Sequence, residues 1–203
     1  MMKFLFAILL VFLFQSSVYS AEGEGITSDT VVYIIDTDSS KVEWECDLHN
    51  GYVLFENGEL KVVDGEIVDG TLNACMESII DLDIDYELMR LTLQNTLKSI
   101  EFFYSEKYHF SNFTVDHIES TQGSPTIFGD LTILGVTKCV SFQYKVIFES
   151  DTLQAKTNTI ILDRTDFGNT SMSLEDAKSD KSFIVPNDFK IIVTLVGVKD
   201  STN

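Results

Sequence analysis

Basic residues are scarce in this sequence of 203 residues: Lys and Arg together number 14, against 32 Asp and Glu, which leaves a net charge of −18. A surface this acidic repels nucleic-acid phosphates and anionic headgroups, so we expect no nucleic-acid partner. Solubility is the ordinary consequence of such a charge. The length suits one domain, with at most a short appendage.

Cysteine is scarce as well, with only Cys46, Cys75 and Cys139 in the chain. Three cysteines cannot all pair with one another, and three are too few for a disulfide scaffold. We expect them to be small, buried or half-buried apolar side chains with at most one disulfide, and the sequence does not choose the pair.

Catalytic sequence motifs are missing. The chain has no Gly-rich phosphate loop, no G-x-S-x-G elbow and no H-E-x-x-H helix. The carboxylates at positions 81, 83 and 85 imitate the start of an EF-hand calcium loop, but Tyr86 and Thr92 occupy the positions that need Gly and Glu. We therefore assign no catalytic residue and expect no enzyme.

Metal-ligand spacing is also absent. Cys46 and His49 could share an ion, yet zinc needs three or four protein ligands, and the other histidines and cysteines are scattered along the chain. We expect no metal site. The same two residues are the only local pair for acid–base or nucleophilic chemistry, so a small hydrolase or isomerase would have to use them.

One long apolar run, residues 4–14, follows a short basic start. Polar and small residues come next, up to Ser20, which is the three-part layout of a secretory signal peptide cleaved before Ala21. A membrane-spanning helix needs about 20 apolar residues, roughly twice this run. We expect residues 1–20 to be a signal peptide and residues 21–30 a flexible lead-in. The protein should be exported, periplasmic or secreted, without stable membrane insertion.

Residues 126–148 show the clearest strand pattern. In their second half, apolar Val140, Phe142 and Tyr144 alternate with polar residues, and the first half repeats this more loosely. Successive side chains of a strand point to opposite faces, so this pattern predicts one dry and one wet face. Gly135 marks a tight turn between two strands of a hairpin.

Three Asx-Gly pairs lie at positions 50–51, 57–58 and 64–65. Asx-Gly favours the two-residue turns that join antiparallel strands. We therefore predict a meander of short adjacent strands in this part of the chain.

The pattern changes after Asp85. Tyr86, Met89, Leu93 and Leu97 recur at spacings of three and four, which predicts one face of a helix of about three turns with Asp85 as its N-cap. Together with the strands, this predicts an all-β fold: an antiparallel eight-stranded, lipocalin-like barrel with one short α-helix, over residues 31–199.

Aromatic residues are abundant, with 15 Phe, 7 Tyr and 1 Trp. They could fill a solid core, since aromatic side chains dominate core burial. They could equally line an apolar cavity for a lipid-like molecule. Periodicity does not distinguish a filled barrel from a hollow one.

The segment GDLTILGVTK at residues 129–138 resembles the G-x-L-T-I-x-G-V-T-K signature of the YceI-like family of exported, lipocalin-like proteins. Other segments agree with that family in the same order along the chain, from Tyr33 to about Val198. They are YIID at 33–36, SSKV at 39–42, Trp44, HNG at 49–51, LKS at 97–99, Phe102-Phe103 and DRTDFG at 163–168. The chain departs from the family pattern at Thr96, Glu101 and His109.

The resemblance implies a barrel that encloses a long apolar tunnel and binds polyisoprenoids such as prenylated quinone precursors, with no other cofactor and no catalytic residue. Burial of such a chain is favourable without any ionic contact, at about 0.8 kcal/mol per CH₂ group. The residues expected to line the tunnel or lie beside it are Phe102, Phe103, Phe113, Phe128, Leu131, Ile133, Phe142 and Tyr144, with Trp44 and His49 as neighbours.

Two hypotheses from different classes therefore stand. The first is an exported binding protein that stores or transports a polyisoprenoid or a similar long apolar amphiphile. The alternative is a ligand-free structural, interaction or stress-response barrel, which predicts bulky side chains meeting across the axis and an exposed apolar patch. The sequence leaves open a homodimer, and it does not give the head group of a ligand.

Overall fold

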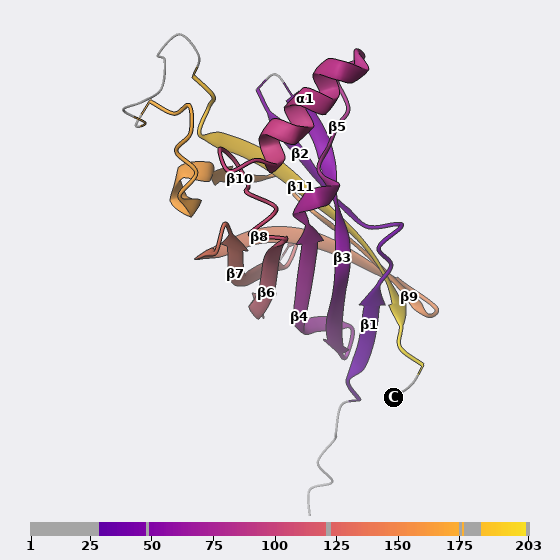
Figure 1. The fold of residues 1–203 in the computed structure, drawn as a ribbon. Helices are drawn as coiled ribbons and strands as arrows, with labels where there is room; N and C mark the ends of the chain where they lie inside the picture. Colours follow the sequence, from indigo (N-terminus) through magenta and orange to yellow (C-terminus); the bar gives the residue numbers. More distant parts are fainter. Residues whose placement is uncertain (1–28, 48, 121–122, 175, 177–183, 202–203) are drawn as a thin grey trace, which may run out of the picture.

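Eleven antiparallel strands form one continuous sheet in the computed structural model, which describes residues 29–47, 49–120, 123–174, 176 and 184–201 (Figure 1). The predicted signal peptide and residues 21–28 of the lead-in lie outside the described residues. The strands are β1 (Val31–Ile35), β2 (Lys41–Cys46), β3 (His49–Val63), β4 (Glu66–Cys75), β5 (Ile80–Asp81), β6 (Phe110–Glu119), β7 (Thr126–Ile133), β8 (Val136–Glu149), β9 (Thr152–Thr157), β10 (Ile160–Asp163) and β11 (Asp188–Lys199).

Eight of these strands close a ring in the order β2, β3, β4, β6, β7, β8, β9 and β11, with β11 paired to both β9 and β2. The three short strands extend this ring. β1 pairs with β3 and β11 beyond the end of β2, β10 pairs with β11 beyond β9, and β5 pairs with β3. The predicted eight-stranded antiparallel barrel is therefore confirmed.

The hairpin expected at residues 126–148 is present as β7 and β8, which pair from Thr126↔Gln143 to Ile133↔Val136. Its turn has positive φ at Leu134 (54°) and Gly135 (75°), as a two-residue turn between antiparallel strands requires. Burial along β8 alternates as predicted, because the barrel covers only one face of the strand.

Two of the three predicted Asx-Gly turns are wrong. β3 runs without a turn through positions 50–51 and 57–58, and only Asp64 and Gly65 form one, leading into β4. Gly51 serves close approach instead: a Cβ there would lie 1.8 Å from the carbonyl oxygen of Ile80. Gly58 is also tight, and the pairing of β3 with β4 is irregular at Asn57. A glycine inside a strand marks such contacts as well as turns.

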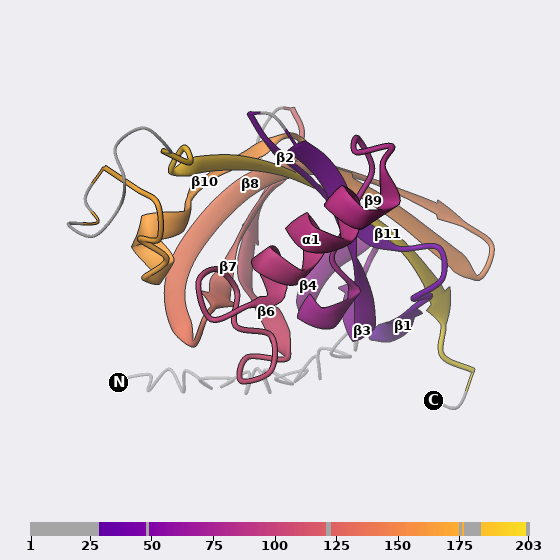
Figure 2. The ribbon, with the colours of Figure 1, turned by 45° about the horizontal axis from the view of Figure 1, so that its top comes forward.

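The predicted helix is confirmed as α1 (Glu87–Lys98), but its N-cap is Tyr86 and not Asp85. The expected apolar face is only half correct. Leu93 and Leu97 are half-buried, whereas Tyr86 and Met89 are 64% and 61% exposed. The reason is the position of α1 across one end of the barrel, where only part of the helix meets the wall (Figures 1 and 2).

Short 3₁₀ segments complete the described elements: η1 (Met76–Ser78) follows β4, and η2 (Arg164–Phe167) follows β10. Asn158 and Thr159 separate β9 from β10. Cys46, Cys75 and Cys139 are all free thiols, and Cys139 is exposed rather than buried. Within the described residues, no helix is both long and apolar enough to cross a membrane.

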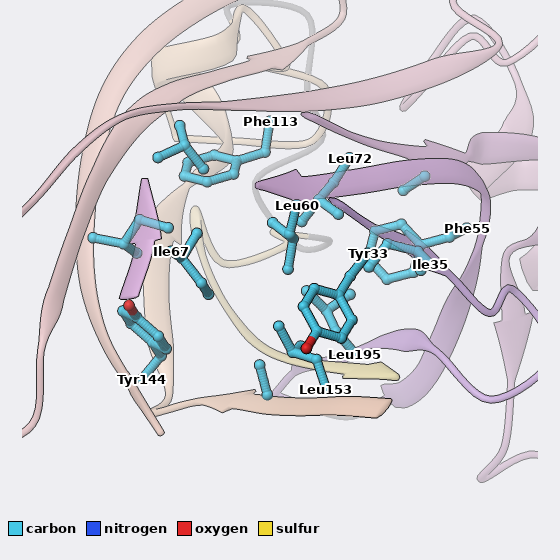
Figure 3. Close-up of a cluster of buried hydrophobic side chains, with 14 of the residues drawn as sticks. Tyr33, Ile35, Phe55, Leu60, Ile67, Leu72, Phe113, Tyr144, Leu153 and Leu195 are labelled. Carbon is cyan, nitrogen blue, oxygen red and sulfur yellow. The ribbon is translucent and has the colours of Figure 1, made fainter. Parts of the chain in front are cut away.

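The core lies at the inner face of the barrel. Leu60 from β3 and Leu153 from β9 are almost completely buried, and Tyr33 and Phe148 pack with ring centroids 5.9 Å apart. Figure 3 shows inward-pointing side chains from opposite walls meeting in this cluster. The packed cluster occupies only part of the interior.

Candidate ligand cavity

A cavity of about 220 Å³ lies inside the barrel next to this core. Residues from every strand of the closed ring contribute to its wall, as do Leu97 of α1 and Phe102 and Phe103 after it. The barrel is therefore hollow, which answers the question that periodicity left open. An apolar cavity of this kind is a typical ligand site.

The wall of the cavity is almost wholly apolar. Aliphatic and aromatic side chains dominate it, and the few polar or charged residues are Ser111, Asn112, Lys156, Thr157, Arg164 and Asn169. A ligand here would be held by burial of its hydrocarbon surface rather than by ionic contacts.

The β7–β8 hairpin supplies one side of the cavity. Leu131 and Ile133 of β7 and Val140, Phe142 and Tyr144 of β8 all line it. Their positions follow from the period of two, because residues at alternate positions of each strand point inward.

Aromatic packing continues this wall into β6. The rings of Phe142 and Phe113 lie with centroids 5.3 Å apart and planes inclined by 45°. Aromatic pairs favour such tilted arrangements. The two phenylalanines therefore hold each other in place where the wall passes from one strand to another.

The structure brings together eight of the ten residues expected to line the cavity or lie beside it. They are Trp44, Phe102, Phe103, Phe113, Leu131, Ile133, Phe142 and Tyr144. Phe128 and His49 are not among the lining residues. Phe128 alternates with Ile127 and therefore points outward, where its ring stacks on His117 at a centroid distance of 4.5 Å. The ring of His49 pairs with Asp83, with Nδ1 3.0 Å from Oδ2.

Trp44 of β2 reaches the cavity beside a glycine that makes room for it. A Cβ at Gly51, the residue opposite Trp44 in β3, would lie 2.7 Å from Cζ2 of the indole. Nε1 of Trp44 is buried and has no hydrogen-bond partner among the described residues. The indole thus contributes to this wall mainly as an apolar surface.

The end of the cavity next to α1 is formed by the chain that follows the helix. Phe102 is buried, its carbonyl accepts a hydrogen bond from Nδ2 of Asn169 at 3.1 Å, and the guanidinium of Arg164 lies 6.0 Å from its ring centroid. Charged groups over aromatic faces are attracted by the ring quadrupole. Segments far apart in the sequence therefore meet at this end.

Sequence reasoning missed Arg164 as part of the site. It is 6% exposed, lines the cavity and donates to carbonyl groups of the chain that follows it, including those of Asn169 and Val185. The one sequence feature that could have indicated this role of Arg164 is its place in the segment DRTDFG, which is part of the resemblance to the YceI-like family. A lone Arg in a polar stretch gives no sign from composition that it is buried.

Two ionisable side chains that line the cavity, Cys46 and Tyr144, have raised pKa values and are therefore neutral near pH 7. Burial, followed by the charge of Asp47, raises the pKa of the Cys46 thiol despite the opposing effect of Arg164. Burial, followed by Glu66, also raises the pKa of Tyr144. A neutral thiol is a weak nucleophile.

The Cys46–His49 pair has no hydrogen bond between its side chains among those found in the described residues, and the His49 ring is instead bonded to Asp83. The only acid–base pair that the sequence offered therefore lacks the contact that activates a nucleophile. We assign no catalytic residue to the cavity.

Comparisons with solved structures give similar barrels. Burkholderia cenocepacia BcnA is 18% identical over 80% of this chain and 98% of that chain, with a TM-score of 0.63. A polyisoprenoid binding domain from Saccharophagus degradans, implicated in plant cell wall breakdown, is 12% identical over 83% and 98%, with a TM-score of 0.58. A Campylobacter jejuni YCEI protein is 18% identical over 78% and 84%, with a TM-score of 0.51. At these identities the likeness shows the fold alone.

A search of curated protein sequences gives no match. The chain does match the YceI-like domain over residues 33–196, which is most of its length. The resemblance carried by the segments between Tyr33 and Val198 is thereby confirmed. The chain belongs to the YceI-like family.

Proposed function

We propose that this protein binds a polyisoprenoid or a similar long apolar amphiphile inside its barrel and stores or transports it. The observation that carries the proposal is the cavity of about 220 Å³ with an almost wholly apolar wall. The Saccharophagus degradans domain with a similar fold is described as polyisoprenoid binding, which supports the same ligand class here.

The energetics favour a chain-like ligand. Burial of about ten hydrocarbon carbons, two isoprene units, contributes about 8 kcal/mol before the costs of association. A cavity of 220 Å³ exceeds the roughly 150 Å³ that holds one benzene in an engineered apolar core. A longer chain would extend past this volume, and its polar head would then remain near the barrel end.

The alternative hypothesis, a ligand-free interaction barrel, predicts two structural features. Exposed apolar side chains are present, because Leu88 and Met89 at the start of α1 and Ile100 after its end are more than 60% exposed. Bulky side chains meet in the packed cluster, but among the described residues they do not fill the whole interior, because the cavity lies beside that cluster. Ligand binding therefore accounts for more of the molecule.

Export is part of the proposal. The basic start, the apolar run over residues 4–14 and the small residues before Ala21 support a cleaved signal peptide and a periplasmic or secreted protein. Peptide mapping of the protein from its own host tests this, and a mature N-terminus at Ala21 is the expected result.

Native mass spectrometry of protein purified from its own host tests ligand binding, with organic extraction to identify the bound lipid. Val140→Trp places an indole in the cavity, whereas Ser141→Trp adds the same indole to the outer face of the same strand. We expect wild type and Ser141→Trp to carry a lipid and Val140→Trp to lose it. Wild-type protein without an apolar ligand, and without affinity for prenylated probes, would refute the proposal.

A further inference from the structure

One histidine and two carboxylates converge outside the cavity lining, at His49, Asp81 and Asp83. One ring nitrogen of His49 and one oxygen of each carboxylate all lie within 4.8 Å of one another. His49 and Asp83 are 34 positions apart in the chain, so no local spacing in the sequence indicates the cluster. The cavity and its proposed lipid do not account for it.

Strand pairing brings these residues together. β5 pairs with the start of β3, placing Asp81 opposite Gly51, and the amide of Leu82 donates to the carbonyl of Asn50 at 2.9 Å. The amide of Asn50 in turn donates to Oδ1 of Asp83 at 2.7 Å. Backbone hydrogen bonds therefore fix the relative position of the His49 strand end and the two carboxylates, independently of any bond between the three side chains.

The separations suit a metal ion. Nδ1 of His49 lies 3.0 Å from Oδ2 of Asp83 and 3.8 Å from Oδ2 of Asp81. Two ligands each about 2.1 Å from one ion, at angles of 90° to 110°, lie about 3.0 to 3.4 Å apart. The three ligand atoms all lie within 4.8 Å of one another, so small movements of the three side chains would bring them into this range.

The Asp81 carboxylate supplies an independent observation. Its side chain is fully buried, and Oδ1 accepts a hydrogen bond from the amide of Ile84 at 3.0 Å. Oδ2 is buried, faces the cluster and has no hydrogen-bond partner among the described residues. A buried carboxylate oxygen without a partner is costly, and a bound cation removes that cost.

We propose that His49, Asp81 and Asp83 bind one divalent transition-metal ion, with Zn²⁺ as the reference ion. Imidazole and carboxylate together suit such ions, and the two carboxylates balance its charge. His49 is 37% exposed, which leaves room for water to complete the coordination. Ca²⁺ and Mg²⁺ prefer oxygen ligands alone and should bind more weakly.

The ion would tie two parts of the fold together. His49 starts β3, and Asp83 lies between β5 and α1, the helix across the end of the barrel. Occupation of the site should therefore stabilise the folded chain, because binding to the folded state alone raises its stability. This inference is independent of the proposed lipid, since none of the three residues lines the cavity.

Untagged protein, stripped with EDTA and dialysed, tests the proposal by calorimetric titration with Zn²⁺ and by elemental analysis. We expect one Zn²⁺ per chain, a raised Tm and weaker binding of Ca²⁺. His49→Gln and Asp83→Asn should each weaken Zn²⁺ binding at least about 10-fold, because removing a direct ligand costs at least as much as the roughly 10–100-fold loss of an outer-shell partner. His117→Gln is the matched control, since His117 pairs with Asp116 at 2.8 Å on the exposed surface.

His49 and Asp83 are partly exposed, so both variants should fold, and circular dichroism checks this. Absence of a stoichiometric Zn²⁺ site in the wild type would overturn the proposal. Unchanged affinity in both folded variants would do the same, as would an equal loss in His117→Gln or equally tight Ca²⁺ binding.

Discussion

Replacement of Arg164 by Met should destabilise the barrel strongly. The guanidinium donates from Nε to the carbonyl of Pro186 at 3.0 Å, from Nη1 to Asn169 and to the carbonyl of Ser171, and from Nη2 to the carbonyl of Val185 at 2.9 Å. Met keeps most of the aliphatic stem that packs at the cavity but removes every donor. The change therefore removes the hydrogen bonds, the charge and the guanidinium over the Phe102 ring, and it leaves most of the apolar packing in place.

The magnitude follows from the acceptors left behind. Each buried carbonyl that loses its partner costs about 1–3 kcal/mol, and the loss of a buried charge that itself was costly offsets part of the sum. We expect a net loss of about 3–5 kcal/mol in the free energy of unfolding. For a chain of this size that corresponds to a fall of roughly 10 °C in Tm.

Urea unfolding followed by circular dichroism measures this loss. Lys138→Met is the control, because Lys138 is an exposed cation 3.8 Å from Asp166 and such pairs are worth at most about 1 kcal/mol. A loss below about 1 kcal/mol for Arg164→Met would refute the reasoning. It would mean that water satisfies the carbonyls and that Arg164 does not hold the residues around it.

Three further predictions concern the barrel itself. The side chain of Leu60 is only 2% exposed, so Leu60→Ala should lower the free energy of unfolding, measured in urea, by about 2–5 kcal/mol. Ile147→Ala, on the outer face, should lower it by less than about 1 kcal/mol. Gly135→Ala should cost about 1–3 kcal/mol, because φ is 75° at this turn. Asp163 accepts hydrogen bonds from the hydroxyl and amide of Thr165, which lower its pKa from 3.8. The stability advantage of wild type over Asp163→Asn should therefore be full at pH 7 and disappear as the pH falls through that lowered pKa.

The strand pattern of β7 and β8 was predictable because alternation is a local property of the chain. Ile133 and Tyr144 point inward at alternate positions of their strands, and one buried face enforces that parity. The same rule would have excluded Phe128, which has the opposite parity to Leu131 and Ile133. Its inclusion came from aromatic character alone, and parity was the stronger signal.

The turns were harder to predict because glycine has two uses in a sheet. Gly65 has φ of 82° and forms a turn, whereas Gly51 lies in a strand against the Ile80 carbonyl. The sequence shows Asx-Gly in both places. Which use applies depends on a neighbour from a distant part of the chain. The cluster at His49 was not predictable for the same reason.

The hollow interior connects the fold to the proposed ligand. A closed, dry cavity costs about 24 cal/mol per Å³, so about 5 kcal/mol is the upper bound for 220 Å³, and even that bound is comparable with the whole stability of many domains. Larger side chains at positions such as Val140 would fill part of the cavity and make the empty barrel more stable, yet the natural residues leave the cavity open. A ligand that fills it stabilises the folded chain by mass action. Delipidated wild-type protein should therefore melt lower than lipid-loaded protein, and Val140→Trp should show no such difference. Equal Tm values for the two wild-type forms would show that the lipid does not bind in the cavity.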